Sequence, residues 1–338
     1  MDSTNFTVVR LTGSRSKPAF HPRFAYYLLH GYDLAKLFYR MGGGLRQSMK
    51  FDDLKRMSVV RPPPPDQERI ASFLDEKTAR IDALIAEKER LLDRLREYHL
   101  STTWSLVTKG CNPANVFVPT DVDWIGETPS NWVVKKLKWL TPVARGASPR
   151  PIDDPKFFDE SGTYAWVRIA DVSASDGLLT KTEQQMSDLG ASLSVKLEPG
   201  ALFLSIAGTV GKPCIAGIRC CIHDGFVWFP AIGQEPLRDW LFSIFEAGFA
   251  YAGLGKMGTQ LNLNTDTVGG ISIPVPPPAE MQAALSALKE AKAANTELQS
   301  HVIEHISLLR EYRSSLISAA VTGQLNINDF QPRQLEAA

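Results

Sequence analysis

The sequence lacks most of the features that would mark a membrane protein, a secreted protein or an enzyme. No apolar run approaches the roughly 20 residues needed to cross a bilayer. The polar start Met1–Asn5 does not have the basic-then-apolar layout of a signal peptide. The four cysteines form no C-x-x-C pair, which indicates reduced thiols in a cytoplasmic protein. No nucleophile–base pair, paired-carboxylate motif or dinucleotide fingerprint stands out, so we expect a non-catalytic chain.

The formal net charge is zero, which at first argues against a nucleic-acid-binding protein. The charge is unevenly distributed, however. Residues 1–61 carry 11 Lys and Arg against four Asp and Glu, whereas residues 111–278 carry 13 against 17. An acidic central segment cannot hold DNA through its overall field, so DNA binding would require a locally basic face or partner subunits.

The chain contains one long repeat. Prolines at Pro62–Pro65 precede a helical pattern that ends in the letters LREY and VTKG, and Pro276–Pro278 precede one that ends in LREY and VTG. The tyrosines of the two LREY runs are Tyr98 and Tyr312, which gives an offset of 214, and the two copies stay in register at this offset. Such a repeat around a different globular segment predicts a pseudo-symmetric protein. Duplex DNA is the commonest pseudo-symmetric partner.

Each copy predicts one long helix. The prolines break regular structure, and Asp66 is a candidate N-cap. Nine following positions alternate in spacings of four and three, and seven are apolar, as in a coiled-coil seam: Ile70, Leu74, Lys77, Ile81, Leu84, Lys88, Leu91, Leu95 and Tyr98. The second copy places Ala284, Leu288, Ala291, Asn295, Leu298, Val302, His305, Leu309 and Tyr312 there. We expect an antiparallel pair, with the helix from Asp66 to Lys109 about 66 Å long. Asn295 and His305 either fix its register or lie at a solvated margin.

Between the helices, residues 111–278 predict a mixed α/β domain with one clear helix at Leu237–Ala250. Four segments resemble strands: Val133–Leu137, Tyr164–Ile169, Ala201–Ile206 and Phe226–Phe229.

The residues before the first helix resemble the end of this domain. Gly44–Arg61 aligns with Gly258–Val275 without a gap, and His21–Leu28 resembles Glu235–Phe242. At this offset the chain begins opposite Cys214 and Ile215. We therefore expect the first copy to lack about its first hundred residues, to have an incomplete sheet and to be the least stable part.

Two motifs suggest chemistry that their details do not favour. Gly208–Lys212 is similar to a P-loop, but only two residues separate its glycines and Pro213 follows the lysine, so a tight turn between strands is the better interpretation. Cys214, Cys220, Cys221 and His223 lack the paired spacing of zinc knuckles. Adjacent cysteines on a strand would also point to opposite faces.

Loops of the central domain hold the candidate DNA-binding residues. Arginine reads guanine and amide side chains suit adenine, so Arg145, Arg150 and Gln260 are the candidates for base contacts. Lys181, Lys212 and Lys256 are the candidates for phosphate contacts. The complete predicted set is Arg145, Ser148, Arg150, Arg168, Lys181, Lys212, Lys256, Gln260 and Asn262. For each one the competing interpretation is a solvated surface side chain. Trp166 lies near Arg168 in the motif order, and for Trp166 the competing interpretation is burial.

Several motifs occur in an order that is more specific than any one of them: Asp123–Trp132, Trp166–Val172, Leu197–Ser205, Gly208–Lys212 and Leu263–Pro278. With these motifs the chain resembles, over nearly its whole length, the specificity subunit of type I restriction-modification systems.

The resemblance implies an α+β protein, in which globular mixed α/β target-recognition domains alternate with two long helices packed as an antiparallel coiled coil. The domains would read the two halves of a split double-stranded DNA site. The helices would dock two S-adenosylmethionine-dependent modification subunits, with restriction subunits outside, and this chain would carry no cofactor. The expected divisions are an incomplete first recognition domain (1–61), a proline-rich start and first helix (62–110), a complete second domain (111–278), a second helix (279–325) and a tail (326–338).

One departure from the family pattern concerns the first domain. It is expected to lack its opening motif, its equivalent of the Arg145–Arg150 loop and its Gly-Thr-Val-Gly-Lys turn. Either this is a shortened subunit, or the chain self-associates or another chain completes the domain. A rival hypothesis is therefore an assembly or regulatory subunit without DNA binding. The weakest is a nucleotide-using enzyme.

Overall fold

The computed structural model describes residues 7–10, 20–40, 57–232, 236–251, 254 and 263–330. The chain forms two compact units. Unit 1 comprises Met1–Leu95 with Thr296–Ala338, and unit 2 comprises Arg96–Asn295. Among the described helices, none has a stretch long and apolar enough to cross a membrane.

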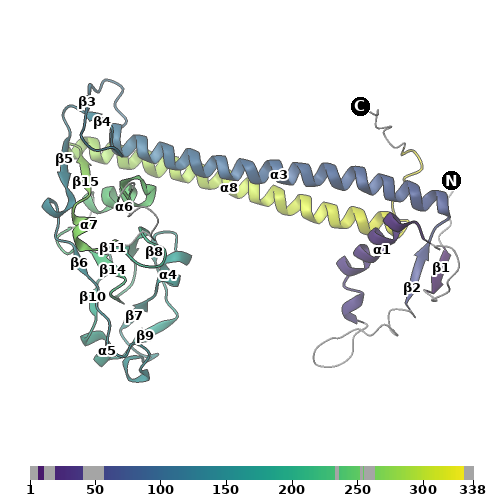
Figure 1. The fold of residues 1–338 in the computed structure, drawn as a ribbon, viewed down its shortest axis with the longest axis horizontal. Coiled ribbons are helices and arrows are strands. Elements are labelled where there is room, and N and C mark those ends of the chain that lie inside the picture. The colour runs from purple at the N-terminus through teal and green to yellow at the C-terminus, as the bar shows by residue number, and fades with distance from the viewer. Residues whose placement is uncertain are drawn as a thin grey trace. The chain divides into compact units, whose positions relative to one another are not determined.

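Two long helices, α3 (Pro64–Lys109) and α8 (Pro278–Val321), run through both units and pack antiparallel (Figure 1). Proline begins each helix, where its missing N–H costs no hydrogen bond. Acidic residues follow in the first turn, Asp66 in α3 and Glu280 in α8. The predicted antiparallel pair is confirmed. Past α8, Ile327 is buried in unit 1, and the ring of Phe330 packs edge-on against Phe73 at 5.0 Å.

The predicted seam is right at some positions and wrong at others. The buried seam residues are Ile70, Leu74, Ile81, Ala284, Leu288, Asn295 and Val302. Six predicted seam residues are exposed instead: Leu84 (40%), Leu91 (38%), Tyr98 (67%), Leu298 (53%), Tyr312 (58%) and His305. Leu92 and Ile306 occupy the contact in place of their neighbours Leu91 and His305. Asn295 is buried, whereas His305 is exposed.

Unit 2 contains the predicted mixed α/β domain. Its five-stranded sheet has the order β6 (Ala144–Arg145), β14 (Phe226–Trp228), β11 (Leu202–Ser205), β12 (Pro213–Ala216), β8 (Leu178–Leu179). The four-stranded sheet has the order β10 (Val195–Leu197), β13 (Cys220–Ile222), β7 (Tyr164–Val167), β9 (Gln184–Met186). The helices are α4 (Ile169–Ala174), α5 (Asp188–Ser192), α6 (Leu237–Ala247) and α7 (Thr265–Gly269). Short 3₁₀ turns are η2 (Leu137–Trp139), η3 (Pro155–Phe157) and η4 (Phe249–Tyr251).

The two ends of this domain meet beside the helices. β5 (Val133–Lys136) pairs antiparallel with β15 (Ser272–Val275), and β3 (Phe117–Pro119) pairs with β4 (Glu127–Pro129). Glu280 of α8 accepts hydrogen bonds from Asn131 (2.6 Å) and from the indole of Trp132 (2.8 Å). The opening motif Asp123–Trp132 therefore fastens the start of the domain to the first turn of α8.

Unit 1 repeats this arrangement in a shorter form. β1 (Thr7–Arg10) pairs antiparallel with β2 (Ser58–Arg61), and α1 (Pro22–Leu34) followed by η1 (Phe38–Arg40) lies between them in the chain. β2 and β15 correspond to each other at the offset of the repeat. Both accept an antiparallel partner in the same register, Thr7 opposite Arg61 and Val133 opposite Val275. β1 therefore has the role in unit 1 that β5 has in unit 2.

This pairing corrects the expectation that the first copy has lost its start. The letters Asn5-Phe6-Thr7-Val8 correspond to Asn131-Trp132-Val133-Val134 of the opening motif, although Asn5 and Phe6 lie outside the described residues. The difference between the copies is internal. One hundred residues separate β5 from α6, but only 11 separate β1 from α1.

The helices α1 and α6 bury the same face. Tyr27, Leu28, Gly31 and Tyr32 are buried in α1, and Trp240, Leu241, Ile244 and Phe245 are buried at identical spacing in α6. These sets correspond at an offset of 213, so the sequence alignment at 214 is wrong by one position for this helix. Within unit 1 the face packs on α3 and α8, where a Cβ on Gly31 would lie 3.0 Å from Val321.

Candidate nucleic-acid interface

Three of the predicted DNA-binding residues form hydrogen bonds to one residue, Asp224, in the turn between β13 and β14. The backbone carbonyl of Asp224 accepts a hydrogen bond from Nε of Arg145 (2.7 Å). Its carboxylate accepts one from the hydroxyl of Ser148 (2.9 Å) and one from the guanidinium of Arg150 (2.8 Å). Both arginines are exposed. Each gives one donor nitrogen to Asp224, which leaves further guanidinium donors at the surface.

Backbone hydrogen bonds hold the loop that follows β6 against the turn between β13 and β14. Gly146 donates its N–H to the carbonyl of Phe226 (2.9 Å), and Ala147 donates to Ile222 (3.1 Å). A Cβ on Gly146 would lie 2.1 Å from the carbonyl oxygen of His223, so a larger residue would push the loop away. The glycine therefore holds the two arginines against the β13–β14 turn.

The electrostatics of the turn keep Asp224 ionised. Burial raises the pKa of its carboxyl, but the hydrogen bond from Ser148 and the charge of Arg150 outweigh burial and hold the pKa below its usual value. The neighbouring His223 accepts a hydrogen bond at Nδ1 from Gly225 (2.9 Å) and packs on Phe226. Burial lowers the pKa of His223, although Asp224 opposes the shift. The cluster thus places a neutral ring and an ionised carboxylate behind two cationic side chains.

Sequence reasoning missed Asp224 itself. The signal available was the run His223-Asp224-Gly225 between two strand-like segments, since Asp and Gly are typical of turns. That signal predicts a turn but does not indicate which loop packs against it.

Arg168 lies at a different place. It precedes α4 and forms ion pairs with Asp171 (3.3 Å) and Glu183 (2.6 Å), and hydrogen bonds to both carboxylates raise its pKa. It lines a hollow of about 900 Å³. The other charged residues of the hollow are acidic: Asp153, Asp159, Glu160 and Glu183. Its aromatic wall is formed by Phe158, His223 and Trp166, and Trp166 is buried at 3% exposure. The charge of Arg168 is therefore balanced by carboxylates.

The ammonium group of Lys212 forms hydrogen bonds within the protein. It donates to the carbonyls of Ser173 (2.8 Å) and Ser175 (2.9 Å), where α4 ends. Cations are favourable at helix C-termini because the last carbonyls have no partner within the helix. The Gly208–Gly211 segment forms a tight turn between β11 and β12, with φ of 66° and 85° at its glycines, as predicted.

The remaining predicted residues divide between one exposed lysine and a stretch that is not described. Lys181 is exposed in the loop between β8 and β9, and no described residue forms an ion pair or hydrogen bond with its ammonium. Lys256, Gln260 and Asn262 lie outside the described residues. The structure thus unites Arg145, Ser148 and Arg150 and places Arg168 and Lys212 in structural contacts.

The cysteines are separated as their sequence predicts. Cys220 packs in a cluster with Phe203 and Phe226, whereas Cys221 packs on the other side of β13 with Trp166 and Met186. Burial raises the pKa of Cys220 to about 12 and that of Cys221 to about 11. Within the described part of the chain, no group of three or more His, Cys, Asp or Glu residues is placed to hold a metal ion.

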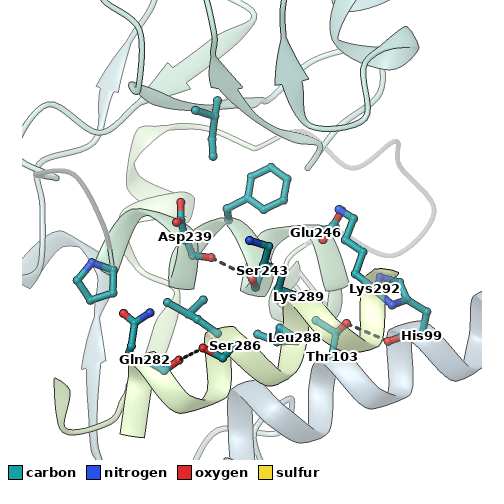
Figure 2. A pocket seen from close by; sticks show the side chains of 14 residues that line it. His99, Thr103, Asp239, Ser243, Glu246, Gln282, Ser286, Leu288, Lys289 and Lys292 are labelled. Atoms are coloured by element: carbon teal, nitrogen blue, oxygen red, sulfur yellow. Dashed lines mark hydrogen bonds and ion pairs between the residues drawn. The ribbon is translucent and has the colours of Figure 1, made fainter. Parts of the chain in front are cut away.

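A second hollow, of about 440 Å³, lies among α6 and the parts of α3 and α8 that belong to unit 2 (Figure 2). Its charged residues are largely paired, with Lys292 2.6 Å from Glu246. His99 lies beside this pair, and burial lowers its pKa. Ser243, Ser286 and Thr103 donate their hydroxyls to carbonyls one turn back in their own helices. Of the predicted DNA-binding residues that the structure describes, none lines this hollow.

No protein-family model matches the chain. Among solved structures it is similar to a chain from a study of complex assembly and conformational transition of the type I R-M system, with a TM-score of 0.69, 17% identity and coverage of 90% of this chain and 72% of the other. It is also similar to the HsdS subunit from Thermoanaerobacter tengcongensis, with a TM-score of 0.54, 18% identity and coverage of 90% and 71%. The mixed α/β domain and the antiparallel long helices thus form the fold of the type I restriction-modification specificity subunits.

Proposed function

We propose that the chain is the DNA-specificity subunit of a type I restriction-modification complex and reads one half of a bipartite site with unit 2. The observation that carries the proposal is the Asp224 cluster. In a domain that is acidic overall, it presents two exposed guanidinium groups on a loop held rigid by backbone hydrogen bonds. Arginine is the commonest reader of guanine in the major groove.

The long helices would dock the partner subunits. Leu84, Leu91 and Tyr98 follow one another at spacings of seven on α3 and are exposed. Adding 214 gives Leu298, His305 and Tyr312 on α8, which are exposed too. We call these two sets the docking stripes. Two related stripes on one chain suit two copies of one partner, which we propose to be modification subunits.

The division of labour follows from this assignment. The modification subunits would bind S-adenosylmethionine and carry out methylation, and restriction subunits would join the assembly outside. This chain would contribute sequence reading without a cofactor of its own. The complex would act in the cytoplasm.

The test is selection from a randomised DNA library by the chain assembled with modification subunits. Enrichment of one short fixed motif would support the proposal, and a second motif at fixed spacing would show that unit 1 also reads DNA. A stable assembly that enriches no motif would contradict the proposal.

One observation favours a second candidate. Unit 1 keeps β1, α1 and β2 but lacks the hundred-residue stretch that, in unit 2, contains the Asp224 cluster. A chain with one reading domain could act as an assembly or regulatory subunit that occupies modification subunits. Competition with a two-domain specificity subunit, together with no motif in the selection, would establish that role instead.

A further inference from the structure

The outer surface of α1 and η1 in unit 1 is unusually apolar. Five large apolar side chains of this short segment are exposed: Tyr26 (57%), Leu29 (40%), Leu34 (36%), Leu37 (36%) and Tyr39 (59%). We call this set the α1 face. Over the corresponding α6 and η4 of unit 2, Phe249 is the only exposed large apolar residue among the described ones. Apolar patches of this kind mark interaction surfaces more often than single exposed leucines do.

Unit 2 shows what covers the corresponding surface. Residues 140–232, which we call the recognition lobe, contain both sheets and the Asp224 cluster. Phe229 of the lobe stacks on Phe245 of α6 at 5.6 Å, and Gly177 lies directly against the ring of Phe242. Gly211 also lies against an aromatic ring, since a Cβ at this position would be 2.7 Å from the ring of Tyr251 in η4. The lobe thus rests on α6 and η4 through aromatic rings and glycines.

The positions that meet the lobe have counterparts in unit 1. At the offset of 213 given by the buried faces, Phe242 corresponds to Leu29, Phe245 to Tyr32 and Tyr251 to Phe38. Leu29 is exposed, Phe38 is partly exposed, and Tyr32 is buried with its hydroxyl accepting the N–H of Val60. Unit 1 therefore keeps the platform on which a lobe rests and lacks the lobe.

We propose that the α1 face is a docking surface for a recognition lobe of this construction, supplied by another polypeptide. The occupant would be a small two-sheet lobe that presents glycines and an aromatic side chain to α1, as residues 177, 211 and 229 do to α6 and η4. The correspondence between the two copies within this chain supports this docking, which does not depend on whether unit 2 reads DNA.

The experiment supplies the lobe to the full chain. Residues 11–21 are replaced by a second copy of residues 137–234, which follows the same route from strand to helix as in unit 2. Hydrogen exchange of Pro22–Leu34 is compared with that of the unmodified chain, and DNA is selected with both proteins. We expect at least tenfold slower exchange of α1, and a second copy of the half-site that unit 2 selects.

The control is the pair Leu29→Glu and Leu37→Glu, made in both proteins. In the unmodified chain these changes should leave thermal unfolding and the selected half-site unchanged, because both side chains are solvent-exposed. In the lobe-bearing chain they should abolish the slowed exchange and the second half-site, while the half-site of unit 2 persists.

Two outcomes would overturn the proposal. One is α1 exchange that does not respond to the added lobe, although the exchange pattern of unit 2 appears twice. The other is self-association of the unmodified chain in light scattering that Leu29→Glu and Leu37→Glu reverse, because the occupant would then be a second copy. Loss of selection by unit 2 alone would instead count against the proposed DNA-reading function.

Discussion

Arg150 is the residue whose replacement tests base reading most directly. Changing Arg150 to alanine should cost about 1–3 kcal/mol on the selected site and broaden the sequences accepted at one position. The reason is that an arginine that pairs with a base edge adds binding free energy only for DNA that carries that base. Fluorescence anisotropy at fixed salt, with selected and random duplexes, measures the difference.

A matched control is available within the same domain. Arg219 is also exposed and forms a similar ion pair, 3.0 Å from Glu198. Arg219→Ala should leave affinity for the selected site unchanged. Equal losses on selected and random DNA for Arg150→Ala would identify Arg150 as a phosphate contact.

Lys212 should contribute to folding stability and not to DNA affinity. Because its ammonium binds two carbonyls at the end of α4, Lys212→Met should lower the free energy of unfolding by about 1–2 kcal/mol. The salt dependence of DNA binding should stay the same, since no phosphate contact is lost. Urea unfolding and a salt titration separate the two roles. If Lys212→Met instead reduced the slope of log binding constant against log salt concentration by about one and left stability unchanged, Lys212 would be a phosphate contact.

Asp224 should make unit 2 sensitive to acid. Its folded-state pKa lies below the unfolded value of about 3.9, so its contribution is fully present above that value and is lost as the pH falls through the folded pKa. Asp224→Asn should remove this part of the acid dependence of the unfolding free energy. Urea unfolding from neutral pH down to pH 3 measures it, and parallel curves for the two proteins would contradict the prediction.

The docking stripes of α3 and α8 predict where partners bind. Leu84→Glu with Leu298→Glu places a charge in each stripe, and burial of an unpaired charge at an interface is costly. Binding of modification subunits should weaken at least tenfold, about 1.4 kcal/mol, measured by calorimetry.

Ala86→Glu with Ser300→Glu is the matched control for the stripes. Both positions are exposed and are related by the same offset of 214. Each follows a stripe residue, Leu84 or Leu298, by two positions, which is a rotation of about 200° around the helix. They should leave binding unchanged. An equal effect of both pairs would show that partners do not dock along the stripes.

The long helices could be predicted from sequence, but not their full contact surface. A strict seven-residue pattern drifts by about 20° per heptad from the 3.6-residue turn of a straight helix. The pattern is therefore correct at Ile70, Leu74 and Ile81 and is displaced by one residue at Leu92. The same drift replaces His305 with Ile306 on α8. The side chains that the pattern misplaced are the ones that form the docking stripes.

The candidate site shows a similar limit. The loop with Arg145 and Arg150 stands out by its residue types, and their exposure agrees with a surface role. Their common partner Asp224 is distant in the chain, beyond most of the strands of both sheets. Local sequence does not specify which distant turn a loop packs against. For the same reason the structural contacts of Arg168 and Lys212 could not be anticipated.

The two-unit organisation was predictable in outline because the repeat is long and in register. Which elements unit 1 contains could not be predicted, because a gap-free alignment applies one offset to the whole segment and so cannot show an internal difference in length. Strand pairing brings Thr7–Arg10 beside Ser58–Arg61, although α1 and η1 lie between them in the chain, and this pairing identified the internal difference between the copies. The proposed docking of a lobe depends on that correction.

The burial of three cysteines makes the chain convenient for labelling. Cys214, Cys220 and Cys221 are buried and their thiol pKa values are raised, so the reactive thiolate is scarce at neutral pH. Cys111 is the exposed one of the four, just past the end of α3. A maleimide dye should therefore attach at Cys111 without mutagenesis. It would report by fluorescence on the point where the first long helix passes into the mixed α/β domain of unit 2 as partners assemble.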